Sequence, residues 1–199
     1  GYCDAPWARE IEKLPPNVNY VFTPERNNAN IGSDFVKKET AGKTEEIPYL
    51  MAELGGGLQP TKHRRPVASA ADIGAMSLVK LGCGANLLGY YMYHGGSNPE
   101  GRNTTLQETK KTGSWNELPA YNYDFQAPVG EYGQVRESCR EIKLLSMFLH
   151  DFGSGLCTMK PEFPSPVMDD AGNLETLRTC VRRNGERGYL FVNNYQRLY

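Results

Sequence analysis

The sequence has no apolar run long enough to cross a bilayer, and its first residues, GYCDAPW, have neither the charged start nor the apolar core of an export signal. We therefore expect no membrane-spanning segment, and any export signal would lie outside these residues. An excess of charge is also lacking, because 22 Lys and Arg are scattered among 23 Asp and Glu for a net charge of −1. Without a basic face, the chain is expected to bind neither nucleic acid nor an anionic membrane surface.

Metal-ligand spacing is absent as well. The histidines His63, His94 and His150 do not fall at the intervals of a metal site, and the cysteines contain no Cys-x-x-Cys pair. An odd, dispersed set of five cysteines also argues against a disulfide framework. We therefore predict no metal and no cofactor, and we expect most of the cysteines to be small core residues outside any disulfide: Cys3, Cys83, Cys139, Cys157 and Cys180.

Aromatic residues and glycine are plentiful. With 199 residues, of which 39% are hydrophobic, the chain can form one fair-sized core, and it carries 12 tyrosines, two tryptophans and 21 glycines. Aromatic rings beside Gly, Asn and Pro loops suit a carbohydrate site, because sugar rings have apolar faces that stack and hydroxyls that hydrogen-bond. The composition therefore favours a sugar-binding class of protein.

One stretch places a carboxylate at the end of a predicted strand. Residues 47–52 form a short apolar run with one proline, and Glu53 follows directly before the glycines at 55–57. Short apolar runs that end in glycine are typical of buried strands in parallel sheets, and α/β folds place their chemistry just past such strand ends. From these residues alone, a solvated loop glutamate is the alternative, and it stays open. The glycines are not a phosphate loop, because no Gly-Lys-Ser/Thr follows them.

A helix and a second strand follow this stretch. Ser69 and Asp72 have the form of a capping box, which predicts a helix over 70–81 with Ile73, Met76 and the Lys80 stem facing inward. Residues 85–93 then read as a near-continuous apolar and aromatic strand. Strand, helix and strand in about forty residues indicate a βαβ unit of a parallel sheet or barrel.

The remaining segments up to residue 150 predict further helices, one strand and a long loop. Before residue 47 the patterns predict a helix over 6–14, a strand over 18–22 and a short helix over 33–38. Residues 97–130 read as a long polar loop of the kind that is usually functional, and Trp115 within it either stacks on a sugar or packs in the loop. A helical period then spans 131–150.

The end of the chain has a different character. Glycines and prolines predict a linker over 153–166, and β-rich segments at 176–182 and 189–193 flank Asn184-Gly185, a hairpin signal. The domain prediction is therefore an α/β part over 1–152, the linker, and the truncated start of a β-domain over 167–199. The α/β part has three predicted core strands, whereas a closed (β/α)8 barrel has eight, so the chain is expected to be a fragment.

Glu53 stands in the block AELGGG, residue 86 begins NLLGYYMYHGGSN, and residue 123 begins YDFQAP. These three blocks resemble the later part of the catalytic barrel of glycoside hydrolase family 35, the β-galactosidase family. The block AELGGG around Glu53 looks like the family's nucleophile strand, and NLLGYYMYHGGSN, from residue 86, resembles its strand ending in Y-M-x-H-G-G-T-N, with Ser97 for the usual threonine. YDFQAP, from residue 123, with Glu131 behind it, is similar to the family's Y-D-Y-D-A-P block. GYLFVNNYQ near the end resembles the opening of the β-domain that follows the barrel in relatives.

The resemblance implies an α/β fold, the later portion of a (β/α)8 TIM barrel followed by the start of an all-β domain. It implies a secreted or periplasmic retaining exo-β-glycosidase that acts on terminal β-galactosides, with Glu53 as nucleophile and Tyr123 and Phe125 at the substrate. Strand alternation puts Tyr91 and Tyr93 on one face, which makes Tyr93, at the strand end, a further ligand-lining residue. The family's acid/base lies in an Asn-Glu pair on an earlier strand. No such pair precedes Glu53 here, so the partners would be the substrate and a missing N-terminal part of the barrel, and the isolated chain is expected to be inactive.

Two departures from the family pattern concern specificity. Phe125 stands where the family usually has a tyrosine whose hydroxyl reaches the sugar, and Gln126 stands where aspartate is common. Because sites that hydrogen-bond sugar hydroxyls discriminate strongly, galactose specificity is more in question than hydrolysis. The alternatives are a non-catalytic carbohydrate-binding or structural fragment, and a relative that acts on another β-linked sugar.

Overall fold

The structure is a computed structural model that describes residues 1–6, 15–24, 26, 47–61, 64–99, 102 and 121–197. The predicted helix over 33–38, nearly all of the predicted helix over 6–14, and Trp115 lie outside these residues. The described elements, in chain order, are η1 (Val18–Tyr20), β1 (Tyr49–Leu54), α1 (Ala70–Gly82), β2 (Ala85–Tyr90), β3 (Gly96–Ser97), β4 (Asn122–Tyr123), α2 (Glu137–Leu156), β5 (Lys160–Glu162), β6 (Arg178–Asn184) and β7 (Arg187–Asn193).

The predicted βαβ unit is confirmed. β1 and β2 pair in parallel with α1 between them, in a register that joins Tyr49 to Ala85 and Leu54 to Tyr90. The strand expected over 85–93 is wrong in its last three residues, because β2 ends at Tyr90. Its partner β1 ends at Leu54, which pairs with Tyr90, and the glycine turn follows. Residues after Tyr90 therefore have no residue of β1 to pair with.

The first helix forms as the capping pattern predicts. Ser69 Oγ accepts a hydrogen bond from Asp72 N at 3.1 Å, and Asp72 Oδ2 accepts one from Ser69 N at 2.8 Å, which completes both arms of the capping box. Ile73, Met76 and Lys80 are buried, as their spacing predicts. Asp72 also accepts bonds from Tyr20 and Tyr195, so the start of α1 holds two distant segments in place.

The second helix lies further along the chain than expected. α2 spans Glu137–Leu156 rather than 131–150, because the backbone before it turns back on itself, with Arg136 N donating to Pro128 O at 2.9 Å. The linker predicted over 153–166 is also wrong, since the last turn of α2 and strand β5 occupy it. Gly153 lies inside the helix, and the helical spacing from Leu149 to the buried Leu156 outweighs its low helix propensity.

The strand predicted over 18–22 is a 3-10 turn instead. The side-chain oxygen of Asn17 accepts a hydrogen bond from Asn19 N at 2.8 Å, and Val21 N donates to Val18 O. Asparagine side chains that bond to the nearby backbone compete with strand pairing in this way. Tyr20, which ends this turn, and the next two residues, Val21 and Phe22, are all buried. Their side chains therefore do not alternate between a buried and an exposed face, as those of a half-buried strand would.

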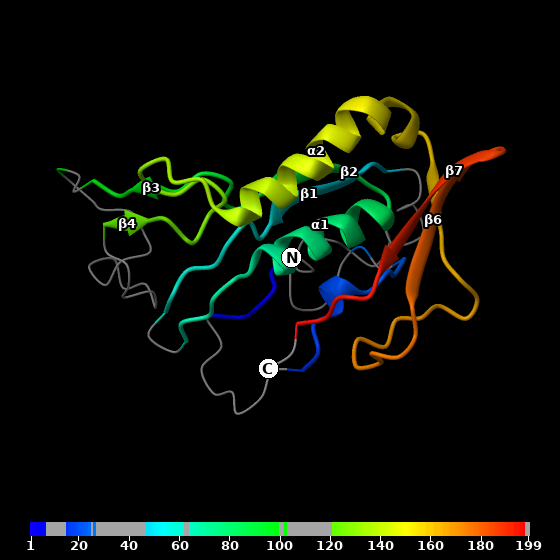
Figure 1. Cartoon of the computed structure of the whole chain (residues 1–199), viewed down its shortest axis with the longest axis horizontal. Helices are drawn as coiled ribbons and strands as arrows, with labels where there is room; N and C mark the ends of the chain where they lie inside the picture. The colour runs from blue at the N-terminus through cyan, green and yellow to red at the C-terminus, as the bar shows by residue number, and fades with distance from the viewer. Residues whose placement is uncertain are drawn as a thin grey trace.

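The C-terminal hairpin forms where Asn184-Gly185 predicts it. β6 and β7 pair antiparallel through a two-residue turn in which Gly185 has a φ of +59°, and β5 adds a third strand. Cys180 and Phe191 of this sheet share a hydrophobic core with Val79 of α1. The expected β part is therefore joined to the α/β part by a common core, and Figure 1 shows the hairpin beside the end of α1.

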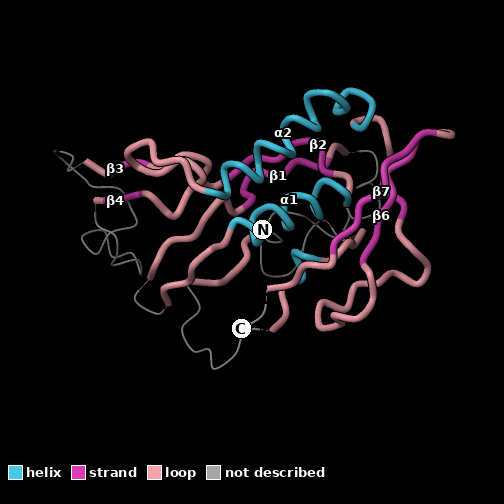
Figure 2. Tube along the Cα trace, viewed as in Figure 1, coloured by secondary structure: helices cyan, strands magenta, loops and turns pink. Residues whose placement is uncertain are grey.

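The two helices lie side by side over the parallel sheet (Figures 1 and 2). Leu145 and Leu149 of α2 pack on the same core as Met51 and Leu88, which point from the sheet toward the helices. The opposite face of the sheet carries Leu50, 58% exposed, and Leu87, 49% exposed, and the described residues do not cover it. An uncovered apolar sheet face is what part of a larger α/β fold would leave, and the (β/α)8 barrel remains a prediction.

The structure describes all five cysteines, and none of them forms a disulfide. Three are buried as expected, and desolvation raises the pKa of Cys3 and of Cys180 to about 12, which keeps both thiols protonated. Cys157 is exposed and Cys139 half-buried, contrary to a core role.

Among the described helices, none is long and apolar enough to span a membrane.

Candidate active site

Glu53 is the penultimate residue of β1, and its side chain is exposed. The hydroxyl of Tyr2 donates a hydrogen bond to Glu53 Oε2 at 2.9 Å. Gly1 lies along the outer edge of β1, where its nitrogen donates to Glu53 O at 2.7 Å and its carbonyl accepts from Gly55 N at 2.7 Å, the bonding pattern of a parallel neighbour. Tyr2 was missed by the sequence reading, because nothing in the local pattern brings together residues that are 51 positions apart.

Glycines let the three family-like blocks meet after the ends of β1 and β2. A Cβ on Gly55 would lie 2.7 Å from the ring of Tyr2, and one on Gly56 would collide with the carbonyl oxygen of Met92. One on Gly57 would collide with the carbonyl oxygen of Phe125 and lie 2.6 Å from the backbone of Gln126. The backbone after Glu53 therefore packs directly on the second and third blocks.

Replacing Gly57 by alanine is expected to lower the free energy of unfolding by about 1–3 kcal/mol, because the new methyl group would force two backbones apart. Urea unfolding followed by circular dichroism measures this change. Gly96→Ala is the matched control, since a Cβ there meets nothing within 4 Å, and its midpoint should stay close to that of the unmodified chain. Equal midpoints for the two variants would contradict the close approach at Gly57.

An aromatic cluster lies where the second and third blocks meet. The rings of Tyr123 and Phe125 stack with centroids 4.2 Å apart, and Tyr91 lies 6.2 Å from Phe125. The hydroxyls of Tyr91 and Tyr123 are hydrogen-bonded to one another. Phe125 is only 7% exposed, so Tyr91 and Tyr123, which are half-buried, carry the accessible part of this cluster.

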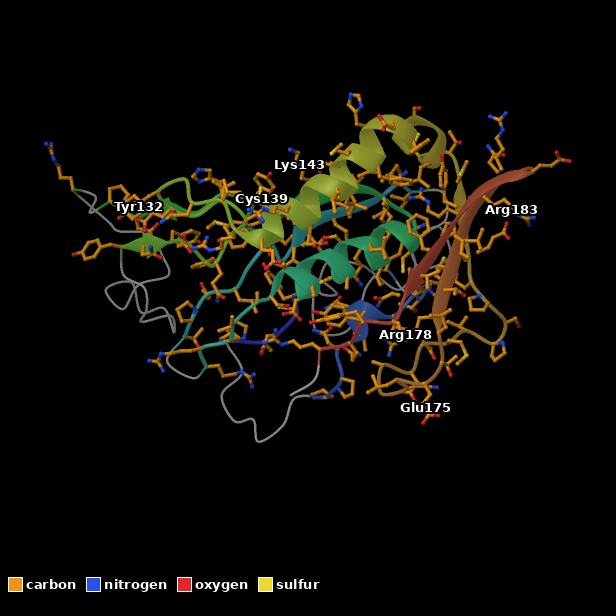
Figure 3. The ribbon with its side chains drawn as sticks, viewed as in Figure 1. Tyr132, Cys139, Lys143, Glu175, Arg178 and Arg183 are labelled. Carbon is orange, nitrogen blue, oxygen red and sulfur yellow. The ribbon has the colours of Figure 1, made fainter. Side chains whose placement is uncertain are left out.

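Tyr93 lies on the other side, which corrects the expectation that it shares a face with Tyr91. Its hydroxyl lies 3.7 Å from Cys139 Sγ on α2, and its ring is 6.3 Å from that of Tyr90. The hydrogen bond with Cys139, with a smaller contribution from desolvation, raises the pKa of the Tyr93 phenol. Figure 3 labels Cys139 near the start of α2. The strand ends at Tyr90, so the two-residue alternation does not extend to residue 93.

The turn that presents Phe125 is built around Asp124. One oxygen of Asp124 accepts from Glu131 N at 2.7 Å, and the other accepts from Gln126 N at 3.1 Å and from Arg136 Nη2 at 2.6 Å. Phe125 and Gln126 both have left-handed backbones, with φ of 50° and 56°. Such a conformation is uncommon for a bulky residue, and it turns Phe125 toward Tyr123.

A second carboxylate, Glu131, closes the base of the long loop. Its two oxygens accept hydrogen bonds from Ser97 and from Asn122, which are themselves partners in the short β3–β4 ladder. Asn98 N donates to Tyr121 O at 2.6 Å on the loop side of that ladder. These contacts join the two ends of the predicted loop over 97–130 next to Tyr123.

The described part of the chain contains no group of three His, Cys, Asp or Glu side chains that could hold a metal ion. His94, at the end of the second block, is exposed, and its Nδ1 lies against the carbonyl of Gly95.

Comparison of the chain with protein-family models and with curated proteins found no match. The resemblance to glycoside hydrolase family 35 therefore rests on the three sequence blocks.

Proposed function

We propose that this chain is the nucleophile-bearing part of a retaining exo-β-glycosidase of glycoside hydrolase family 35, acting on terminal β-galactosides. In this proposal Glu53 is the nucleophile, and the described α/β unit belongs to the later portion of a (β/α)8 barrel. The proposal includes a second carboxylate that another part of the same barrel supplies.

The observation that carries the proposal is the environment of Glu53. It lies at the carboxyl end of a parallel strand, exposed, with Tyr2 donating to its carboxylate at 2.9 Å. The glycines behind it pack on the backbones of Met92 and Phe125, so three sequence blocks converge at this strand end. Active sites of (β/α)8 enzymes are built at this end of their strands, which supports a catalytic rather than a solvated glutamate.

The chemistry uses two carboxyl groups in turn. Glu53 would attack the anomeric carbon while a carboxylic acid protonates the departing glycosidic oxygen, so one carbon–oxygen bond forms as the other breaks. Water would then displace Glu53 from the glycosyl-enzyme, with the second group acting as base. The hydrogen bond from Tyr2 engages Glu53 Oε2 and leaves Oε1 as the oxygen that would attack the sugar.

The carboxylates of the third block are poorly suited to the acid/base role. Asp124 accepts hydrogen bonds from Arg136 and from two backbone amides, so both of its oxygens are already engaged within the turn. Glu131 is occupied by Ser97 and Asn122 at the base of the loop. This supports an acid/base from elsewhere in the barrel.

The test is covalent trapping in the full polypeptide that supplies the second carboxylate. A fluorinated aryl β-galactoside, with fluorine in place of the hydroxyl next to the anomeric carbon and a good leaving group, should label the protein once. Peptide mass spectrometry should find the fluorogalactosyl group on Glu53. Labelling at another residue, or no labelling under conditions where the polypeptide is folded, would refute the assignment.

A non-catalytic sugar-binding fragment is the second candidate, favoured by the commitment of Asp124 and Glu131 to structural contacts. It predicts that galactose perturbs the aromatic cluster of Tyr91, Tyr123 and Phe125 while the fluorinated reagent leaves Glu53 unmodified. The same labelling experiment therefore separates the two candidates.

Replacing Tyr2 by phenylalanine is expected to lower the rate of labelling at Glu53 by about tenfold to a hundredfold. The Tyr2 hydroxyl orients the Glu53 carboxylate, and a nucleophile that is misplaced by about 1 Å loses up to about a hundredfold in rate. Phenylalanine removes the hydroxyl without changing the shape of the ring. The rate of release of the aryl group measures the effect. Tyr132→Phe is the control, because Tyr132 is 81% exposed, and its rate should match the unmodified protein. Equal rates for both variants would rule out a role for the Tyr2 hydroxyl.

A further inference from the structure

We propose that Gln126 is a positioning residue that holds the aromatic wall of Tyr123 and Phe125 against the strand end bearing Glu53. This inference rests on the proposed function and adds a residue that touches neither the sugar nor Glu53. It assigns Gln126 a task that its amide, and not a carboxylate, can perform.

The side chain of Gln126 bonds both ends of the connection between β1 and α1. Its Nε2 donates to Leu58 O at 2.8 Å and to Pro66 O at 2.9 Å, and its Oε1 accepts from Ala68 N at 3.1 Å. Leu58 follows the glycine turn after Glu53, and Ala68 precedes the cap of α1. One amide therefore closes the connection that leads away from the nucleophile.

The hydrogen-bond types explain why an amide is needed. The two carbonyls of Leu58 and Pro66 require donors, and the Ala68 amide requires an acceptor, so the side chain must offer both. A carboxylate has no donor and would place negative oxygens against two carbonyl oxygens. Leu58 is 2% exposed, which makes a lost partner there costly.

The backbone of Gln126 supports a functional reading of these bonds. Left-handed backbones at Phe125 and Gln126 each cost roughly 1–2 kcal/mol, and they persist only where surrounding contacts hold them. The contacts are the Asp124 carboxylate on Gln126 N, the direct packing on Gly57 and the three side-chain bonds. Strain of this kind gathers at binding and catalytic sites, because it fixes a geometry that relaxed backbone would not keep.

The same connection reaches the segment that carries Tyr2. Thr61 Oγ1 donates to Pro6 O at 2.5 Å, and Arg64 pairs with Asp4 at 2.9 Å. Gln126 therefore bonds to a connection whose other contacts hold the segment of Tyr2, the residue that donates the hydrogen bond to Glu53. Moving the Gln126 end would shift the aromatic wall relative to both Tyr2 and Glu53.

The experiment replaces Gln126 by glutamate, which keeps the size and removes both donors. At neutral pH the saturating rate of Glu53 labelling by the fluorinated aryl galactoside should fall by about a hundredfold, the effect of displacing a site by about 1 Å. The deficit should shrink as the pH is lowered, because the introduced carboxyl group regains one donor when it is protonated, whereas the native amide does not titrate. Gln134→Glu is the matched control, since the side chain of Gln134 is exposed and accepts from Tyr132 N, which a carboxylate can also do.

Hydrogen exchange separates this inference from the proposed function. Amides over 58–61 and 64–68 should exchange faster in Gln126→Glu, and in Gln126→Met if the charged variant does not fold, while those of α2 keep their protection. If the unmodified protein is not labelled at Glu53, the glycosidase proposal fails, and unchanged exchange in both variants overturns the role of Gln126. Faster exchange with an unchanged labelling rate would also overturn it, because the residue would then be structural only.

Discussion

Replacing Arg182 by methionine is expected to lower the free energy of unfolding by about 3 kcal/mol. Arg182 is a residue of β6 and is only 1% exposed. Its guanidinium donates to the carbonyls of Leu81 and Ala85 at 3.1 Å, of Leu156 at 2.9 Å and, through Nε, of Met159 at 3.1 Å. A methionine of similar length fills the space but donates to none of these four oxygens.

The position of these carbonyls explains the size of the effect. Leu81 lies in the last turn of α1 and Leu156 ends α2, so one cation from β6 meets the negative ends of both helices. Leu81 O and Leu156 O keep other donors, from Gly84 N and Met159 N, which limits the loss at each. Desolvation lowers the pKa of Arg182, and the four acceptors offset that cost in the folded chain. Removing the cation leaves those acceptors under-satisfied in a buried site.

Urea unfolding by circular dichroism measures this prediction. Arg183→Met is the matched control: Arg183 is the next residue of β6, and its ion pair with Glu162 at 3.0 Å is half exposed, so a change below about 1 kcal/mol is expected. Figure 3 shows Arg183 near the outer end of the hairpin. Arg182→Lys, which keeps the charge and part of the bonding, should fall between the two. Equal midpoints for the variants at 182 and 183 would contradict the central role of Arg182.

Local signals in the sequence predicted the elements whose causes are local. The Ser69–Asp72 capping box defines the start of α1, and Asn184-Gly185 defines the hairpin. The errors at α2 came where contacts outside the helix decide. The start of α2 depends on a turn that folds back on Pro128, and its end depends on Leu156 reaching the core beneath Arg182. The glycines and prolines there had predicted a linker.

The candidate site divides in the same way. The position of Glu53 at a strand end follows from the apolar run and the glycines after it, a pattern that the sequence alone shows. The convergence of the three blocks depends on close backbone contacts of Gly56 and Gly57, which the sequence did not predict. Tyr2 and the Gln126 amide could not be predicted, because each acts across more than 50 residues of chain. The prediction for Tyr93 extended strand alternation beyond Tyr90, where β2 ends. In the structure Tyr91, and not Tyr93, lies beside Phe125.

If Glu53 is the nucleophile that we propose, replacing it by alanine should reduce turnover of an aryl β-galactoside by at least about 10³-fold in the full polypeptide, because the route through the glycosyl-enzyme is lost. Glu53 is exposed, so its loss should leave the thermal midpoint nearly unchanged. The loss of rate is then a loss of chemistry and not of folding. Glu175→Ala, which removes an exposed carboxylate from a loop far from β1, is the control and should keep full turnover (Figure 3).

Rescue by azide gives this prediction a second readout. In Glu53→Ala the space of the carboxylate is open to a small anion, which can attack the anomeric carbon from the side that Glu53 occupied. With a good leaving group, the carbon–nitrogen bond forms as the aryl oxygen departs with its electron pair, and the product is the α-galactosyl azide. Because no second displacement follows, the configuration is inverted, whereas the two-step mechanism proposed for the unmodified protein retains it. A β-configured product, or turnover that Glu53→Ala keeps without azide, would place the nucleophile elsewhere and leave Glu53 as the solvated strand-end carboxylate that its local sequence also permits.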